Sequence, residues 1–596
     1  MRRLSLEERL ARFGADGLPL ASADLECARA RFGRWRDEIF GGREELFRLR
    51  LASIGLEPDR VLPYLVCPAE SSPLRSTRSS DAWIGHASRA IEEHLERLAR
   101  ASTGLEVDVR SVLESIVTPI RELVDRRSRP ALVRDLRRRK IAGDLVGATP
   151  RERWLGFVRG ESGRVLGELP VLERALDEAA DRAVRAFGEL VERLAGDLER
   201  LRDRFALPAR DRLVGVEARL RELHRGGRFV ARLRLASGSD IVYKPRPPAC
   251  EARYQDLVAW LGERWDGPEL RTQHLLDRGA YGWFEFVREA PCSGPAGAGD
   301  YHRRLGAQLA LAHLLAAIDL HMENVVASGD HPFLVDLETI LQPAPRLPPG
   351  TRPADLETAV LTELVAGTRL LPTRFGGPLG SVDIGGTSGR GQERFPFPVP
   401  KWESEGTDEV RQVEGEVILP PAANLPRLGG ARLGPEGHEG ELLEGFESAY
   451  RLFVRRREEL GRRLAGFAGA PVRWPARTTG EYVRVLDESF APEYLADAID
   501  RDFLIDVLWL GVERRPHLAP IVPSETRQLL AGDVPIFTVR ADSRDLDDPS
   551  GAACLGFFER SGLERALDRL GAMGEDDLER QVHAIRASIS TLREDV

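Results

Sequence analysis

The sequence of 596 residues has few cysteines, and they are scattered. Its five cysteines form no C-x-x-C pair, which argues against a clustered structural zinc site and is typical of a protein from a reducing cytoplasm. No apolar run approaches the roughly 20 residues that a membrane span needs, and the N-terminus has no apolar signal-peptide segment. We therefore expect a cytoplasmic protein without a membrane span.

An excess of positive charge is also absent. The net charge is −9, so nucleic acid is not an expected partner. Arginine supplies almost all the basic residues: the chain has three lysines and two asparagines, namely Lys140, Lys244, Lys401, Asn324 and Asn424. Where the chain keeps these rare residues, we expect chemistry that arginine or aspartate cannot supply.

Periodicity predicts a helix-rich α+β protein. Apolar residues at a spacing of three to four predict helices through residues 1–205. Near residue 212 the pattern changes to alternation, and residues 229–235 and 241–244, with a Ser-Gly-Ser turn between them, predict a β-hairpin. We expect four regions: a helical N-terminal capping region (1–205), a catalytic core (206–345), a Pro- and Gly-rich insert of activation type (346–440) and a helical C-terminal region (441–596).

A basic run and a glycine-rich run each allow a functional interpretation, and in each case we favour a structural one. The basic run at 137–140 is a candidate grip for an acidic peptide, but a solvated helix face is the favoured interpretation. The run at 385–391 is rich in glycine yet has no Gly-Lys-Ser/Thr and no preceding strand, so it is not a Walker A loop. We predict a flexible loop of activation type there.

Residues 319–336 carry the strongest chemical signal. Asp319 follows an apolar helix predicted over 302–318, His321 and Asn324 come two and five residues later, and Asp336 ends a short predicted hairpin. The order Asp, Asn, hairpin, Asp is that of the kinase catalytic loop and its metal-binding aspartate. Asp319 is the candidate base for the attacking hydroxyl, and Asn324 and Asp336 are candidate Mg²⁺ ligands.

The histidine refines this interpretation. D-x-H-x-x-N is similar to the form found in phosphoinositide-kinase-like enzymes, in which His321 is placed to hydrogen-bond the transferring phosphate or the substrate hydroxyl. Lys244 ends a predicted strand 75 residues before Asp319, where a kinase needs a lysine for the ATP phosphates. The apolar strand predicted over 281–287 then leads into the hinge, where the backbone of Glu285 and Phe286 is expected to contact adenine.

These motifs bring a family into view. The segments 223–246, 281–287 and 319–338, together with residues 472–482 and 532–537, resemble the dehydratase domain of class II (LanM-type) lanthipeptide synthetases. The resemblance runs from about residue 60 to the C-terminus. It implies a two-lobed lipid-kinase-like core with a helical capping region, the cofactors ATP and Mg²⁺, and a leader-bearing precursor peptide whose Ser and Thr are dehydrated.

The resemblance also implies residue roles. Lys244, Asp319, His321, Asn324 and Asp336 match the positions that phosphorylate the peptide, and His224, Arg473 and Thr479 match those that eliminate phosphate. Glu222 stands where the family has aspartate, which puts its part in elimination in question. Arg473 is suited to bind the departing phosphate bidentately. The group that removes the Cα proton is left open between Lys244 and His224.

Three functions compete at this point. The first is a kinase that also eliminates phosphate, the second a kinase alone, which Glu222 favours, and the third a non-catalytic scaffold for the precursor peptide. The family normally continues into a zinc cyclase domain, and we expect no cyclase activity here. The chain is then either a dehydratase that works with a separate zinc cyclase or a fragment whose cyclase domain is missing.

Overall fold

The protein is a mixed α+β chain, as the periodicity predicted. The computed structural model describes residues 2–14, 22–66, 79–220, 222–346, 361–549 and 553–593. Its contacts divide the chain into two compact units, each of three segments. The first unit contains Met1–Asp240, Trp402–Val413 and Ala476–Ile536, and the second contains Ile241–Lys401, Glu414–Pro475 and Phe537–Val596. The division into four functional regions stays a prediction.

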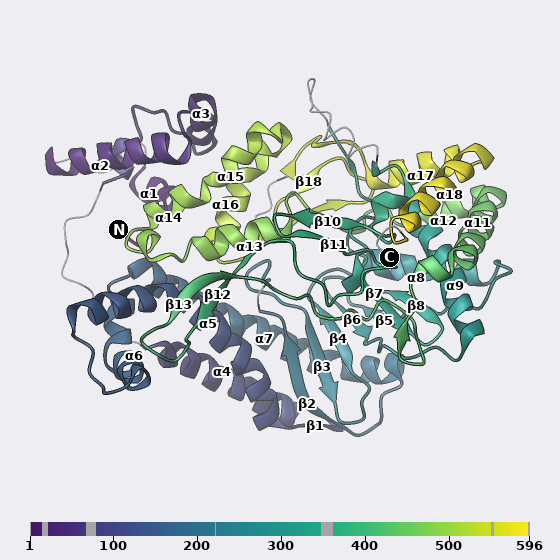
Figure 1. Cartoon of the computed structure of the whole chain (residues 1–596), viewed down its shortest axis with the longest axis horizontal. Coiled ribbons are helices and arrows are strands. Elements are labelled where there is room, and N and C mark those ends of the chain that lie inside the picture. Colours follow the sequence, from purple (N-terminus) through teal and green to yellow (C-terminus); the bar gives the residue numbers. More distant parts are fainter. Residues whose placement is uncertain are drawn as a thin grey trace. The chain divides into compact units, whose positions relative to one another are not determined.

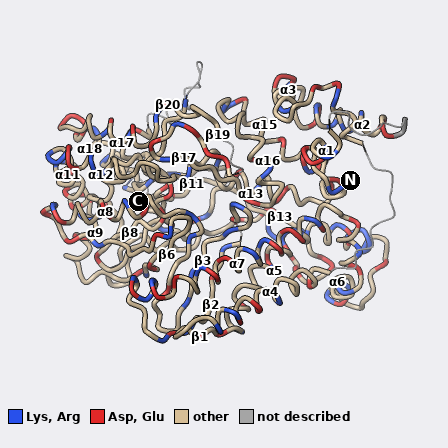
Figure 2. The backbone as a smooth tube through the Cα atoms, turned by 180° about the vertical axis from the view of Figure 1, so that it is seen from behind, with Lys and Arg blue, Asp and Glu red and all other residues tan. Residues whose placement is uncertain are grey.

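Helices dominate the first unit. They are α1 (Leu6–Phe13), α2 (Ser22–Arg34), α3 (Glu44–Ser53), α4 (Ser80–Ala101), α5 (Val109–Ala142), α6 (Pro150–Gly167), α7 (Pro170–Phe205), α13 (Thr479–Glu488), α14 (Ala498–Ile505), α15 (Val507–Leu510) and α16 (Val522–Leu530). The helices predicted within 1–205 are thereby confirmed. Helices α4, α5 and α7 carry both basic and acidic residues (Figure 2).

Three strands of the first unit lie beside these long helices. They are β1 (Leu105–Val107), β2 (Asp211–Ala218) and β3 (Ala231–Leu235), with β1 parallel and β3 antiparallel to β2. Helix α5 packs against β2 and against α4, while α4 also packs on α7 (Figure 1). The apolar faces of the helices are therefore buried against one another and against the strands.

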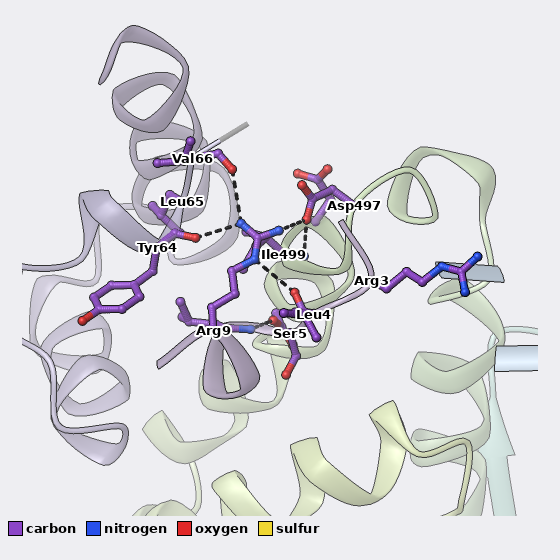
Figure 3. Close-up of polar contacts among 12 residues, drawn as sticks. Arg3, Leu4, Ser5, Arg9, Tyr64, Leu65, Val66, Asp497 and Ile499 are labelled. Atoms are coloured by element: carbon purple, nitrogen blue, oxygen red, sulfur yellow. Dashed lines mark hydrogen bonds and ion pairs between the residues drawn. The ribbon is translucent and has the colours of Figure 1, made fainter. Parts of the chain in front are cut away.

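A buried arginine fastens the N-terminal helix. The Arg9 side chain is fully buried and donates hydrogen bonds to the carbonyls of Tyr64 (2.9 Å) and Val66 (3.2 Å), and it pairs with Asp497 (Figure 3). Nearby, the amide of Leu6 donates to the carboxylate of Asp502 (2.5 Å). Burial raises the pKa of Asp502 to about 8, although this amide lowers it. Segments far apart in the sequence are thus joined by a buried ion pair and a buried hydrogen bond.

The second unit mixes short strands with helices. Its helices are α8 (Ala249–Gly262), α9 (Pro295–Leu314), α11 (Glu439–Arg455), α12 (Arg457–Ala465), α17 (Gly562–Ala572) and α18 (Glu575–Ser590). Its strands are β4 (Ile241–Lys244), β5 (Leu275–Asp277), β6 (Gly282–Glu285), β7 (Val325–Ser328), β8 (His331–Leu334), β9 (Ala344–Pro345), β10 (Arg374–Gly377), β11 (Gly380–Asp383), β14 (Arg427–Leu428), β15 (Ala431–Arg432), β16 (Pro471–Trp474), β17 (Phe537–Arg540), β18 (Leu546–Asp547), β19 (Ala553–Cys554) and β20 (Phe558–Arg560). Strands β12 (Val399–Glu403) and β13 (Arg411–Gly415) span the boundaries of the units.

The second unit confirms most of the elements that the sequence predicted. Strand β6 pairs antiparallel with both β4 and β5, and β7 and β8 form the predicted hairpin. Helix α9 packs on α11, and both bury apolar side chains. The helix predicted over 302–318 ends at Leu314 instead, because Ala316 and Asp319 adopt left-handed backbone (φ 46° and 64°). Among the described helices, none is both long enough and apolar enough to cross a bilayer.

Candidate active site

Lys244 and Asp336 meet in the second unit. Lys244 ends strand β4 and is 7% exposed; its Nζ donates to the carbonyl of Val335 (2.8 Å) and to Asp336 Oδ1 (3.3 Å). The ammonium also lies 4.7 Å from the centre of the Phe284 ring. Residues 92 positions apart therefore place a cation and a carboxylate together. The Asp336 carboxylate stays partly exposed and can still reach a ligand.

Three further charged residues surround this pair, and sequence reasoning missed them. Arg246 contacts Asp336 (2.7 Å), Glu251 on helix α8 (2.6 Å) and Glu338 (3.0 Å). Burial disfavours the Arg246 cation, but Glu251, Glu338 and Asp336 outweigh it and raise the pKa of the guanidinium. Glu251 also lies 3.8 Å from Lys244. The K-P-R and D-L-E runs contain Arg246 and Glu338, but the sequence does not show which charged residues form ion pairs.

Arg473 joins the same network. Its strand, β16, pairs with β17, and its backbone amide donates to the carbonyl of Glu338 (2.7 Å). Its guanidinium bonds Glu338 Oε1 (2.6 Å). Burial opposes the charged form, yet Glu338, followed by Asp336 and Asp319, raises the pKa of Arg473. The structure thus places one residue predicted for elimination beside the residues predicted for phosphorylation.

The loop at 319–324 is held in an unusual conformation. Asp319 has a left-handed backbone (φ 64°), which is uncommon for a residue other than glycine and is enriched at functional sites. Its carbonyl accepts the Asn324 side-chain amide (2.8 Å), and its carboxylate pairs with Arg369 (3.1 Å). His321 Nδ1 accepts the backbone amide of Glu323 (3.3 Å). The neutral His321 ring consequently carries its proton on Nε2.

The glycine-rich run packs onto this loop. The predicted flexible loop is wrong for residues 385–389: Thr387 and Ser388 are buried, and Met322 N–H donates to the carbonyl of Ile384 (2.9 Å). A Cβ on Gly386 would lie 2.4 Å from the carbonyl oxygen of Leu320, so glycine is needed for this close approach. Glycine here serves contact rather than mobility.

The second asparagine fixes the same run. Asn424 is fully buried, and its Nδ2 donates to the carbonyls of Gly386 (3.0 Å) and Gly389 (2.9 Å). The expectation that rare residues mark chemistry is therefore not met at Asn424, which is structural. Two rare lysines also have structural partners, since Lys140 pairs with Asp408 (3.2 Å) and Lys401 donates to a backbone carbonyl.

Residues of the basic run at 137–140 form ion pairs with carboxylates of their own unit. Arg138 pairs with Asp135, and Arg139 contacts Asp135 (2.9 Å) and Glu161 (2.7 Å). These contacts support the interpretation of a charged helix face over that of a peptide grip.

The residues predicted to hold adenine lie at the end of β6. The Glu285 amide donates to the His274 carbonyl (2.9 Å), and the Glu285 carbonyl accepts the Gln273 side chain (2.9 Å). Phe286 follows directly, with the Arg288 guanidinium 5.4 Å from its ring centre. Both backbone groups of Glu285 thus have partners within the protein, and the expected adenine contact stays a prediction.

The remaining elimination candidates belong to the first unit. His224 is half-buried in a turn, with its Nδ1 2.8 Å from the carbonyl oxygen of Val534, and Glu222 is exposed. Thr479 is the first residue of helix α13, behind a capping box formed by Thr478 and Glu481. A helix N-terminus favours anions, so Thr479 occupies a position suited to phosphate.

Two comparisons with known proteins bear on this site. A family model described as "Domain of unknown function (DUF4135)" matches residues 169–540, which include every candidate site residue. The chain is 22% identical over 488 residues to the Lacticin 481/lactococcin biosynthesis protein LcnDR2 of Lactococcus lactis subsp. lactis. That alignment covers 77% of this chain and 51% of the relative, so the chain spans about half the relative's length.

Proposed function

The chain belongs to the DUF4135 family, and from that premise we propose that it phosphorylates Ser and Thr of a ribosomal precursor peptide and then eliminates the phosphate. The products are dehydroalanine and dehydrobutyrine. The relative named for lacticin 481 biosynthesis supports a role in making lanthipeptides. The observation that carries the chemistry is the contact of Lys244 and Arg246 with Asp336.

In the phosphorylation step, we assign Lys244 to the ATP phosphates and Asp319 to the substrate hydroxyl. The donor set fits the cofactors, because Asn324 and Asp336 offer the hard oxygens that Mg²⁺ prefers, and buried cations suit polyphosphate. When bound, Mg²⁺ neutralises charge on the phosphates. His321, with its proton on Nε2, is fitted to donate a hydrogen bond to the transferred group. A two-lobed kinase-like core is part of this proposal, supported by the Lys244–Glu251 approach, which resembles the lysine–glutamate pair of kinases.

In the elimination step, a base removes the Cα proton and the electron pair of the Cα–H bond forms the Cα=Cβ bond. The Cβ–O bond breaks, and phosphate leaves with that bond's electrons. Arg473 is suited to bind the departing phosphate, because its planar fork matches phosphate oxygens. Thr479 at the start of α13 is suited to donate a hydrogen bond to it. Lys244 and His224 are the candidate bases, and Glu222 is a candidate catalytic neighbour of His224.

One observation keeps a kinase alone as the second candidate. Glu222 replaces the aspartate of the family and is exposed, so a loss of elimination at this position is chemically reasonable. A non-catalytic scaffold is disfavoured, because it has no use for a buried lysine held against Asp336. We propose dehydration only, with ring closure left to a separate zinc cyclase or a cyclase domain.

Mass spectrometry of a precursor peptide separates these functions. After incubation with ATP and Mg²⁺, a loss of ~18 Da per site indicates dehydration and a gain of ~80 Da indicates phosphorylation alone. No change in mass supports the scaffold. The matched control for Lys244→Ala is Lys401→Ala, since Lys401 is exposed and outside the site. Equal activity of the two variants would contradict the proposal.

A further inference from the structure

His224 lies in a tight turn of the first unit. The conformation of this turn is held by residues from another part of the sequence. The backbone groups of His224 and Arg228 bond each other twice (3.2 and 2.8 Å), closing the turn. Arg225, Gly226 and Gly227 all have positive φ (48°, 85° and 86°). Glycine adopts positive φ without steric cost, so the unfavourable backbone is that of Arg225, and the two flexible glycines lose conformational freedom in this turn. The turn therefore needs partners that fix it.

Asp533 and Val534 supply those partners. The Asp533 carboxylate is 4% exposed, and it accepts the amides of Gly226 (2.7 Å) and Gly227 (3.0 Å). The Val534 amide donates to the carbonyl of Leu223 (2.8 Å). The Val534 carbonyl oxygen lies 2.8 Å from His224 Nδ1. The backbone and the ring of the turn are thus held by two adjacent residues.

Buried arginines in turn hold Asp533 in place. It follows the C-terminus of helix α16, where carbonyl groups lack partners within the helix. Arg501 donates to the carbonyls of Leu529 (3.3 Å) and Leu530 (3.1 Å), and Arg127 donates to that of Gly532 (3.2 Å). Cations at a helix C-terminus are electrostatically favourable. Hydrogen bonds from buried arginines therefore fix the segment that leads into Asp533 and Val534.

The contact with Val534 decides where the imidazole proton sits. A backbone carbonyl can only accept, so Nδ1 must be the nitrogen that donates. In the neutral ring Nε2 then bears the lone pair, which is the form a general base requires. Lys244, by contrast, acts as a donor toward Val335 and Asp336 and has no lone pair while it is an ammonium.

We propose that Asp533 and Val534 are positioning residues that hold His224 in its Nδ1–H tautomer, and that His224 Nε2 takes the Cα proton of the phosphorylated residue. This inference rests on the elimination step of the proposed function. The proton moves from Cα to Nε2, giving imidazolium, while the C–H electron pair forms the double bond. Phosphate leaves with the electrons of the Cβ–O bond.

Two measurements on the full chain test this. The first is ¹⁵N NMR of ring-labelled histidine, with the His224 signals assigned through His224→Gln among the 11 histidines. In spectra recorded at a pH that keeps the ring neutral, we expect a protonated Nδ1 and an unprotonated Nε2. In Asp533→Asn, one acceptor becomes an amide that faces a backbone N–H, so a mixture of tautomers is expected. A wild-type ring protonated on Nε2 instead would overturn the proposal, whatever the protein's activity.

The second measurement is elimination from a synthetic phosphoserine precursor peptide. We expect kcat to fall about tenfold or more in Asp533→Asn, with KM and the phosphorylation rate unchanged. The matched control is Asp542→Asn in the second unit, whose carboxylate also accepts a glycine amide (Gly469, 2.9 Å). Unchanged elimination in Asp533→Asn contradicts the positioning role. If the wild type does not eliminate at all, the proposed function fails, while the tautomer signals still test the geometry separately.

Discussion

The two units each present a histidine in a short loop, and the two rings are held in opposite ways. In the second unit, His321 Nδ1 accepts a backbone amide, so the neutral ring offers an N–H at Nε2. In the first unit, His224 Nδ1 faces a carbonyl, so the neutral ring offers a lone pair at Nε2. One residue type is therefore prepared as a donor in one place and as an acceptor in the other. The backbone decides between them.

The largest expected effect comes from a substitution in the 319–324 loop of the second unit, which tests whether the two histidine loops serve separate steps. We expect Asp319→Asn to lower peptide phosphorylation by roughly 10²- to 10⁴-fold, because the attacking hydroxyl loses its base. Elimination from a phosphopeptide supplied ready-made should persist in this variant. Mass spectrometry of both reactions measures the split. Equal loss in the two reactions would show that the loops do not serve separate steps.

The converse variant disables the first unit. His224→Gln keeps a hydrogen-bonding side chain of similar reach but removes the proton acceptor. We expect elimination to slow by about 100-fold and phosphopeptide to accumulate, while phosphorylation continues. Dehydration at the normal rate in His224→Gln would refute the acceptor role.

Arg473 tests whether the second unit contributes to both steps. Its guanidinium bonds Glu338 in the network around Asp336. We expect Arg473→Lys to slow elimination about tenfold, because an ammonium keeps the charge but loses the bidentate fork. Arg473→Ala should leave phosphopeptide behind. A matched change at Arg451→Lys, an exposed arginine on α11, should leave both rates unchanged.

The smallest effect concerns the stability of the first unit. The pKa of Asp502 is raised to about 8 by burial, so the folded state binds a proton that the unfolded state has released. Its contribution is complete below about pH 4 and is lost as pH rises toward 8, with a slope of at most about 1.4 kcal/mol per pH unit. We expect Asp502→Asn to flatten the fall in melting temperature between pH 5 and 8. An unchanged fall would contradict the assignment.

Much of the local structure could be predicted from the sequence. Strands β4, β6, β7 and β8 lie close to the predicted segments, because apolar alternation and turn residues are local signals. The approach of Lys244 to Asp336 also agrees with the order of the motifs. The strands and the order of the motifs can be predicted because each is encoded in a short stretch of sequence.

The charge network could not be predicted, because ion pairing is decided by tertiary structure. Arg246, Glu251 and Glu338 belong to a chain in which charged residues are common, and nothing local distinguishes them. The same holds for the tautomer of His224, which depends on a carbonyl 310 residues away. Glycine at 386 was misjudged for a related reason, since its neighbour at Leu320 is invisible in the sequence.

Asn424 shows what scarcity in a composition can mean. Aspartate has nearly the same size, yet it offers only acceptors, whereas two carbonyls three residues apart require two hydrogens on a single nitrogen. A chain with only two asparagines keeps one of them at this position for the polarity of its hydrogen bonds. For a rare residue, the first question is therefore whether its hydrogen bonds require a donor or an acceptor. Its role in a reaction is the second question.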